Sequence, residues 1–308
     1  MSPRQDRRAF LQSSLAGAAG LALFPNAIAR EKPSALSVTA LAEGLVMISG
    51  AGANVVAARG PEGITLVDGG LQERSAELLK LVSKELGGAR VTTLFNTHWH
   101  PEQTGSNTTL GKAGAKIIAH ENTRLWLGYP NPLPDQPNRT YGPLPEVALP
   151  NDTTYDSGHM TLGPEEIDYG YLLQAHTDGD LYVFFHNANV LVTGGVVSGE
   201  GWPIIDYKTG GWIGGLVQGL ATLVKVANAQ TRIVPANGPV LTRADLEAQR
   251  DMYAQIFDRL QKLLRQGMGP DEAVAAAPAK EYEAKWGDAS FFLNQAFRSM
   301  WGHFAPDA

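Results

Sequence analysis

Short hydrophobic runs near the start of the chain have the pattern of β-strands. Residues 44–49, 54–58 and 63–67 are β-prone, and glycine, proline and asparagine separate them. Runs of this length between turn-forming residues are typical of consecutive strands joined by short turns. The pattern therefore predicts a β-meander over residues 44–67.

Helices and strands alternate in the next part of the chain. Apolar residues in 75–86 recur at intervals of three and four, which predicts an amphipathic helix, and 91–95 is a continuous β-prone run that predicts a buried strand. The pattern then predicts a helix at 104–113, a strand at 116–119 and a short helix at 121–128.

A proline-rich stretch, residues 129–150, separates this part from a second β-rich part. A loop of this length is uncommon in a compact domain, and we interpret it either as a lid or as a surface excursion without function. Strands are predicted at 167–173, 181–185, 190–193 and 231–234, and a helix at 212–227.

Two further helices are predicted after residue 241. Thr242 and Asp245 have the spacing of a capping box for a long helix that ends near Gln266, and Pro270 opens another helix. Two β-rich halves, each followed by helices, are typical of an α+β fold in which two central sheets lie between outer helices. The pattern therefore predicts a four-layer αββα sandwich.

Composition narrows the class of protein. With 308 residues, 44% of them hydrophobic, the chain is long enough to bury a large core. The formal net charge is −6, and without residues 1–29 there remain 22 basic and 30 acidic residues, a net charge of −8. An acidic chain without a lysine or arginine cluster is not expected to bind nucleic acid. The absence of cysteine excludes disulfides and thiolate metal ligands.

The N-terminus has the pattern of an export signal. Arg7 and Arg8 precede an apolar stretch that ends near Phe24, and residues 27–29 are the small residues preferred at a cleavage site. We interpret residues 1–29 as a signal peptide of the twin-arginine type and residues 30–308 as one domain, which predicts a periplasmic protein. An ordinary secretory signal or a short membrane anchor is the alternative. Later apolar runs are too short to cross a membrane, so no stable membrane insertion is expected after cleavage.

Two histidines that lie one residue apart form the most informative motif. His98 and His100 occur in Asn-Thr-His-Trp-His-Pro-Glu-Gln-Thr-Gly at residues 96–105, directly after the strand predicted at 91–95. Histidines at this spacing can bind one metal ion. The stretch resembles the loop His-x-His-x-Asp-His of the metallo-β-lactamase superfamily, with Glu102 and Gln103 in place of its aspartate and last histidine. Residues 64–70, 175–180, 190–195 and 233–239 resemble further superfamily motifs in the same order.

The resemblance implies the αββα fold and a zinc site. His98, His100 and His176 match the three histidines of the first metal site in the superfamily, where neutral imidazoles leave a zinc ion its charge to acidify a water molecule. Asp68 matches a carboxylate that supports the metal loop by hydrogen bonds. Trp99 is the tryptophan whose position best suits a substrate cleft.

The second metal site of the superfamily is altered in this chain. Its ligand positions hold Glu102, Gln103, Gly195 and Asn237. Glycine has no side chain to bind metal, and neutral carboxamides bind zinc poorly beside imidazole. One Zn²⁺ per chain is therefore expected. Glu102 keeps a carboxylate, which either assists proton transfer or is an ordinary loop carboxylate.

Two functions follow from these observations. One is a zinc-dependent hydrolase of a small ester, lactone or amide, in which Glu102 assists catalysis. The other is a non-catalytic protein that uses the same cleft to bind or sense a small-molecule ligand. The sequence indicates neither the substrate nor the oligomeric state.

Overall fold

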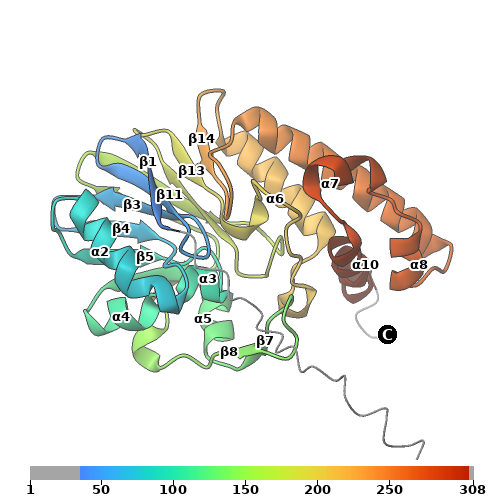
Figure 1. Ribbon diagram of the computed structural model, residues 1–308, viewed down its shortest axis with the longest axis horizontal. Coiled ribbons are helices and arrows are strands. Elements are labelled where there is room, and N and C mark those ends of the chain that lie inside the picture. The colour runs from blue at the N-terminus through green and yellow to red at the C-terminus, as the bar shows by residue number, and fades with distance from the viewer. Residues whose placement is uncertain (1–34, 305–308) are drawn as a thin grey trace, which may run out of the picture. The chain divides into compact units, whose positions relative to one another are not determined.

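Two β-sheets form the centre of the molecule, and helices cover their outer faces (Figure 1). The computed structural model describes residues 35–304. The signal peptide predicted in residues 1–29 lies outside them. No helix in the described part of the chain is long and apolar enough to cross a membrane.

The first sheet has seven strands in the order β1-β2-β3-β4-β5-β6-β9. Strands β1 to β4 pair antiparallel, and the pairs from β4 to β9 are parallel. The bounds are β1 Ser37–Ala42, β2 Leu45–Ser49, β3 Val55–Arg59, β4 Ile64–Val67, β5 Val91–Phe95, β6 Lys116–His120 and β9 Asp152–Thr154.

The second sheet has five strands in the order β10-β11-β12-β13-β14. Only its last pair, β13 with β14, is parallel. The bounds are β10 Ser157–Leu162, β11 Glu165–Tyr171, β12 Leu181–Phe185, β13 Val190–Val192 and β14 Arg232–Val234. A separate short pair joins β7 (Asn131–Pro132) to β8 (Thr140–Tyr141).

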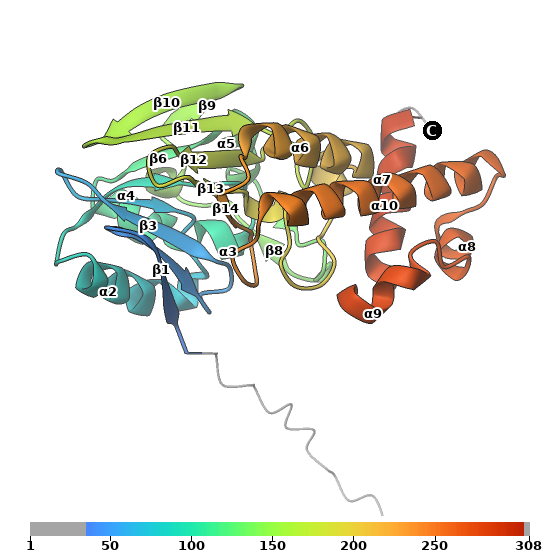
Figure 2. The same cartoon turned by 90° about the horizontal axis from the view of Figure 1, so that it is seen from above.

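Along the chain, helices α2 to α5 come before the strands of the second sheet, α6 lies between β13 and β14, and the remaining helices follow β14 (Figure 2). Helices α8, α9 and α10 lie at the far end of α7, away from the sheets. The bounds are α2 Ser75–Glu85, α3 Pro101–Thr104, α4 Asn107–Lys112, α5 Glu121–Leu127, α6 Ile213–Val226, α7 Arg243–Arg265, α8 Pro270–Ala275, α9 Glu283–Trp286 and α10 Ser290–Phe304.

The hydrophobic pattern of the strands builds the layers. In β3, Val56 packs between the two sheets, whereas Val55 and Ala57 pack in the core that also contains Leu78 of α2. Neighbouring residues point to opposite faces of a strand, so an apolar run can enter two cores at once. β13 does the same in the second sheet. The predicted four-layer αββα sandwich is therefore confirmed.

Most predicted elements are present, with two kinds of difference. Thr242 and Asp245 form the predicted capping box at the start of α7. The helix predicted at 104–113 is present in shorter form as α4, and Thr104 belongs to a separate short helix, α3, that ends before Gly105. A β-carbon at Gly105 would lie 2.2 Å from the Gln72 backbone nitrogen, so this crossing of two backbones needs glycine. The edge strands β1, β9 and β10 and the C-terminal helices α9 and α10 were not predicted.

A surface cluster on the second sheet gives a pH-dependent prediction. Asp168 on β11 contacts His159 Nδ1 and His186 Nε2, each at 2.7 Å. The hydrogen bond between His159 and Asp168 raises the pKa of His159 and lowers the pKa of Asp168. The stabilisation is complete below the ordinary histidine pKa of 6.5, fades as pH rises through the raised value, and is also lost in acid as Asp168 is protonated.

Asp168→Asn is expected to lower the pKa of His159, measured by NMR titration. The same substitution should reduce the free energy of unfolding more at about pH 5.5 than at about pH 8.5. Asp156→Asn, in the turn between β9 and β10, is the control. An unchanged His159 pKa in Asp168→Asn contradicts the assignment.

Candidate metal centre

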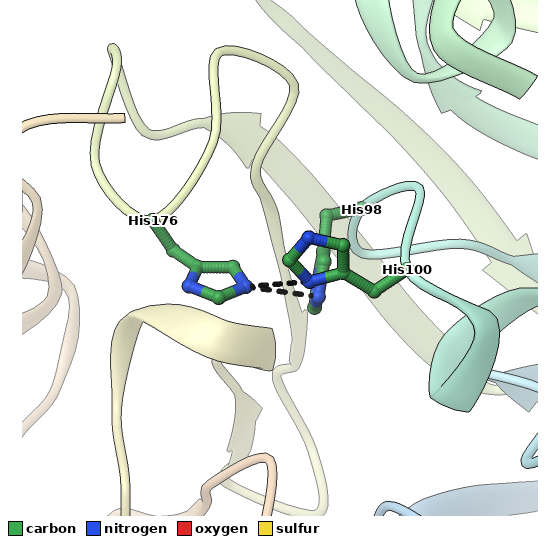
Figure 3. A group of neighbouring side chains, drawn as sticks. All are labelled: His98, His100 and His176. Carbon is green, nitrogen blue, oxygen red and sulfur yellow. Dashed lines mark hydrogen bonds between the residues drawn. The ribbon is translucent and has the colours of Figure 1, made fainter. Parts of the chain in front are cut away.

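Three buried histidines from two distant segments meet at one end of the sandwich. His98 and His100 lie between β5 and α3, and His176 lies in the turn between β11 and β12 (Figure 3). His176 Nε2 is 3.2 Å from His98 Nε2 and 3.0 Å from His100 Nδ1. Nitrogens bound to one tetrahedral zinc ion at about 2.1 Å stand about 3.4 Å apart. The spacing therefore fits a shared ion after small shifts of the rings.

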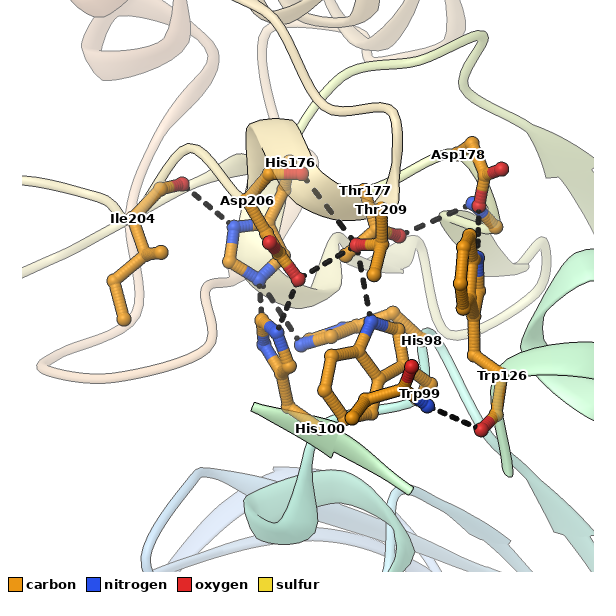
Figure 4. Close-up of polar contacts among 12 residues, drawn as sticks. His98, Trp99, His100, Trp126, His176, Thr177, Asp178, Ile204, Asp206 and Thr209 are labelled. Carbon is orange, nitrogen blue, oxygen red and sulfur yellow. Dashed lines mark hydrogen bonds and ion pairs between the residues drawn. The ribbon is translucent and has the colours of Figure 1, made fainter. Parts of the chain in front are cut away.

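The partners of the outer ring nitrogens decide which nitrogens carry protons. His176 Nδ1 lies 2.7 Å from the Ile204 carbonyl oxygen and must donate to it. His100 Nε2 lies 3.2 Å from a carboxylate oxygen of Asp206 and donates to it (Figure 4). His98 Nδ1 lies 3.1 Å from the Thr97 hydroxyl, which itself donates to Asp68. In neutral rings, the three inner nitrogens are then unprotonated.

Unprotonated nitrogens 3.0 and 3.2 Å apart repel each other unless a cation lies between them. Burial, followed by the neighbouring histidines, lowers the pKa of His98 well below its ordinary value. Burial and His100 likewise lower the pKa of His176. The rings therefore disfavour a shared proton and remain in the neutral form that binds metal. The donor set fits a zinc ion.

The turn that presents His176 is held by Asp180. This buried carboxylate accepts hydrogen bonds from the backbone nitrogens of His176 (2.7 Å) and Thr177 (2.8 Å) and from the Thr177 hydroxyl. The glycine-rich stretch 209–215 packs directly against the turn, and a β-carbon at Gly211 would lie 2.2 Å from the His176 carbonyl oxygen. The close packing of this stretch therefore needs the glycine at position 211.

Asp68 supports the histidine loop by hydrogen bonds to Thr97. It is buried directly after β4, and its carboxylate accepts from the Thr97 backbone nitrogen at 2.8 Å and from the Thr97 hydroxyl at 2.9 Å. Burial raises the pKa of Asp68 to about 8, against the lowering effect of these hydrogen bonds. The predicted hydrogen bonds are present, and they fix the residue that precedes His98.

Asp206 is a residue of the centre that sequence reasoning missed. Besides contacting His100, its carboxylate accepts from the Thr209 hydroxyl at 2.6 Å, and its backbone nitrogen donates to the His176 carbonyl at 2.9 Å. Burial opposes ionisation of Asp206, but the hydrogen bonds from His100 and Thr209 outweigh it, and the pKa of Asp206 is lowered. An aspartate directly after the apolar residues 202–205 was the available signal.

Asp206→Asn is expected to weaken zinc binding by about 10- to 100-fold, because it removes the charge that orients His100 and keeps its Nε2 protonated. Competition with a chelating dye measures the affinity. Asp258→Asn, on an exposed part of α7, is the matched control. Equal zinc affinity in Asp206→Asn and the control would refute this role.

The residues at the altered second-site positions make other contacts in the structure. A β-carbon at Gly195 would lie 2.3 Å from the His176 ring, so an aspartate there is incompatible with the present position of His176. Asn237 accepts from the Ser198 hydroxyl at 2.8 Å and donates to the Glu200 carbonyl at 3.0 Å, which occupies its carboxamide. Gln103 is 3% exposed and lines the cleft described below.

Trp99 does not line the cleft, and that prediction was wrong. Its ring is fully buried against Leu127 and Leu133, and Nε1 donates to Thr209 at 3.2 Å. The loop 129–150 packs on this cluster, and none of its residues, all of which the structure describes, lines the cleft. The loop thus supports the back of the histidine segment, and the lid interpretation has no support from its position.

An open cleft of about 200 Å³ reaches the histidines. Glu102, on the short helix α3, and Trp202 both line it. The lining residues are Gly52, Ala53, His98, His100, Glu102, Gln103, His176, Gly195, Val197, Ser198, Trp202, Pro203, Ile204, Ala236 and Asn237. The structure therefore brings Glu102 together with the three histidines at one solvent-accessible site.

Comparison with known proteins agrees with this geometry. The family description of the metallo-beta-lactamase superfamily matches residues 49–258. The chain belongs to that superfamily. Its members share the fold seen here, and His98, His100 and His176 form a cluster that could hold a metal ion.

Solved structures of the superfamily resemble this chain at low identity. A metallo-beta-lactamase from Pontibacter korlensis is 17% identical, with a TM-score of 0.58 over 71% of this chain and 99% of that one. The DIM-1 metallo-beta-lactamase is 15% identical, with a TM-score of 0.58 over 72% and 99%. The stereoselective inverting sec-alkylsulfatase Pisa1 from Pseudomonas sp. is 16% identical, with a TM-score of 0.67 over 89% of this chain and 51% of that one. These similarities show the fold alone.

Proposed function

We propose that this protein is a hydrolase of a small carbonyl substrate, an ester, lactone or amide, that uses one zinc ion held by His98, His100 and His176. The observation that carries the proposal is the convergence of three unprotonated ring nitrogens, 3.0 and 3.2 Å apart, at the floor of an open cleft. A zinc ion there would polarise a carbonyl oxygen and acidify a water molecule.

The residues around the centre have separable roles in this proposal. Asp206 keeps the outer nitrogen of His100 protonated and its inner nitrogen free for metal. Asp180 fixes the turn that carries His176. Glu102 is the carboxylate on the cleft wall, and it accepts a proton from water and passes it to the leaving group.

The altered second site favours a one-metal centre. Gly195 has no room for a ligating side chain, and the carboxamide of Asn237 is engaged in its own loop. The same observations favour a second candidate, a binding or sensing protein that keeps the cleft without turnover, because contacts that steady a leaving group in a two-metal site are missing.

Zinc-dependent turnover separates the two candidates. Purified protein, stripped of metal and then reloaded with zinc, is assayed on aryl esters, lactones and β-lactams, beside the His98, His100 and His176 triple alanine variant. The hydrolase proposal predicts turnover that appears with zinc and is lost in the variant. Turnover no higher than that of the variant across all substrates would favour the binding protein.

A further inference from the structure

The lining of the cleft carries few charged side chains. Among its lining residues, all in the described part of the chain, there is no lysine or arginine, and Glu102 is the single carboxylate. A divalent ion on three neutral imidazoles would bring two positive charges, and Glu102 together with Asp206 would offset both. The site thus holds no surplus positive charge to attract an anion.

One wall of the cleft is apolar and firmly held. Trp202, Pro203 and Ile204 form a continuous segment of it, with Val197 beside them. The Trp202 ring stacks on Phe292 of α10 with centroids 4.9 Å apart, and its Nε1 donates to the Gly287 carbonyl at 2.8 Å. The segment is therefore positioned by the C-terminal helices to contact an apolar part of a ligand.

Gln103 supplies a neutral polar group in the lining of the cleft. Its side chain is 3% exposed, lines the cleft, and has a carboxamide oxygen without a hydrogen-bond partner among the described residues. Its backbone is fixed, because its carbonyl accepts from Gly69 at 2.6 Å and from Asn96 at 3.2 Å. A buried polar atom without a partner is costly unless a ligand pairs with it.

We propose that the cleft selects uncharged substrates, with an apolar group against Trp202–Pro203–Ile204 and a hydrogen-bonding group at Gln103, and that Glu102 disfavours anionic ones. For the carbonyl group of the substrate this inference rests on the proposed hydrolase function. It separates this protein from the reactions that its structural relatives are named for, because alkyl sulfates carry a negative charge, and so do common β-lactams through their carboxylate.

A matched pair of amides tests the inference through binding. Para-acetamidobenzamide is neutral, and para-acetamidobenzoate has the same shape with a negative charge. Calorimetry on the zinc-loaded protein is expected to show about tenfold tighter binding of the neutral amide. Glu102→Gln should bring the two affinities within about threefold of each other. Glu62→Gln, in the turn between β3 and β4, should leave the ratio of the two affinities unchanged.

The corresponding acetate esters, para-acetoxybenzamide and para-acetoxybenzoate, are then compared as substrates, with each rate divided by its uncatalysed rate. Equal affinities for the two amides, tighter binding of the anion, or no measurable binding of the neutral amide overturns the inference. Selective binding of the neutral amide, without hydrolysis of either ester or of the lactones and β-lactams named above, supports the inference and contradicts the hydrolase proposal. The two failures are thus distinguishable.

Discussion

His176→Ala is expected to lower the affinity for zinc by at least about 100-fold. Zinc sites with four ligands bind with about 10–16 kcal/mol, so one ligand accounts for roughly 3 kcal/mol. The loss of zinc affinity should be no smaller than this, because His176 Nε2 is the nitrogen that faces both other ligand atoms, at 3.2 Å and 3.0 Å. Competition with a chelator of known affinity measures the change.

His186→Ala is the matched control for this substitution. His186 is half-exposed on the second sheet, where it pairs with Asp168, and its removal should leave zinc affinity unchanged. Circular dichroism before zinc addition shows whether either variant is unfolded. A folded His176→Ala protein that binds zinc as tightly as the parent would show that this histidine is not a ligand.

Glu102→Gln is expected to reduce kcat for ester hydrolysis by about 100-fold or more, while zinc affinity stays within about threefold. The carboxamide has almost the same shape but cannot accept the proton of an attacking water molecule. Glu102→Asp keeps the carboxylate on a side chain one methylene shorter, and should retain more activity than Glu102→Gln. KM and kcat are measured separately, because loss of substrate binding would raise KM.

The control is again Glu62→Gln, which removes an exposed carboxylate in the turn between β3 and β4, outside the cleft lining. If kcat is unchanged in Glu102→Gln, this carboxylate carries no proton in the rate-limiting step, and it is an ordinary side chain at the edge of the cleft. Its role in charge selection would then be tested by the amide pair alone.

The layers of the fold could be predicted from the sequence, because the local hydrophobic pattern and the tertiary packing agree in them. An apolar run in a central strand such as β3 contributes side chains to two hydrophobic cores. The capping box of Thr242 and Asp245 is a short motif that marks the start of α7. The edge strands lack this signal. The first four residues of β1 are exposed, so no hydrophobic alternation marks them.

The three histidines were predictable because they lie in motifs of fixed spacing, whereas their supports depend on contacts between distant segments. Asp206 contacts His100 from 106 positions away, and no short pattern connects them. Trp99 was misjudged for the same reason. Its position beside two cleft histidines says nothing about the separate core of Leu127 and Leu133 that buries it.

The break at Gly105 also has a tertiary cause. Gly105 and Ser106 keep right-handed helical dihedrals without belonging to a helix, and the segment of Gly70 and Gln72 passes within 2.4 Å of the position that a β-carbon on Gly105 would take. The resulting turn ends α3 directly after Glu102, Gln103 and Thr104. The close crossing of two backbones therefore sets the position of the residues at the edge of the cleft.

The most direct test of the central claim is the metal content of the folded protein. Protein purified without chelator and supplied with zinc is analysed by elemental mass spectrometry, beside the variant in which His98, His100 and His176 are alanine. We predict about one zinc ion per chain in the parent and none in the variant. Two zinc ions in the parent, no zinc at all, or equal zinc in both proteins would contradict a single three-histidine centre.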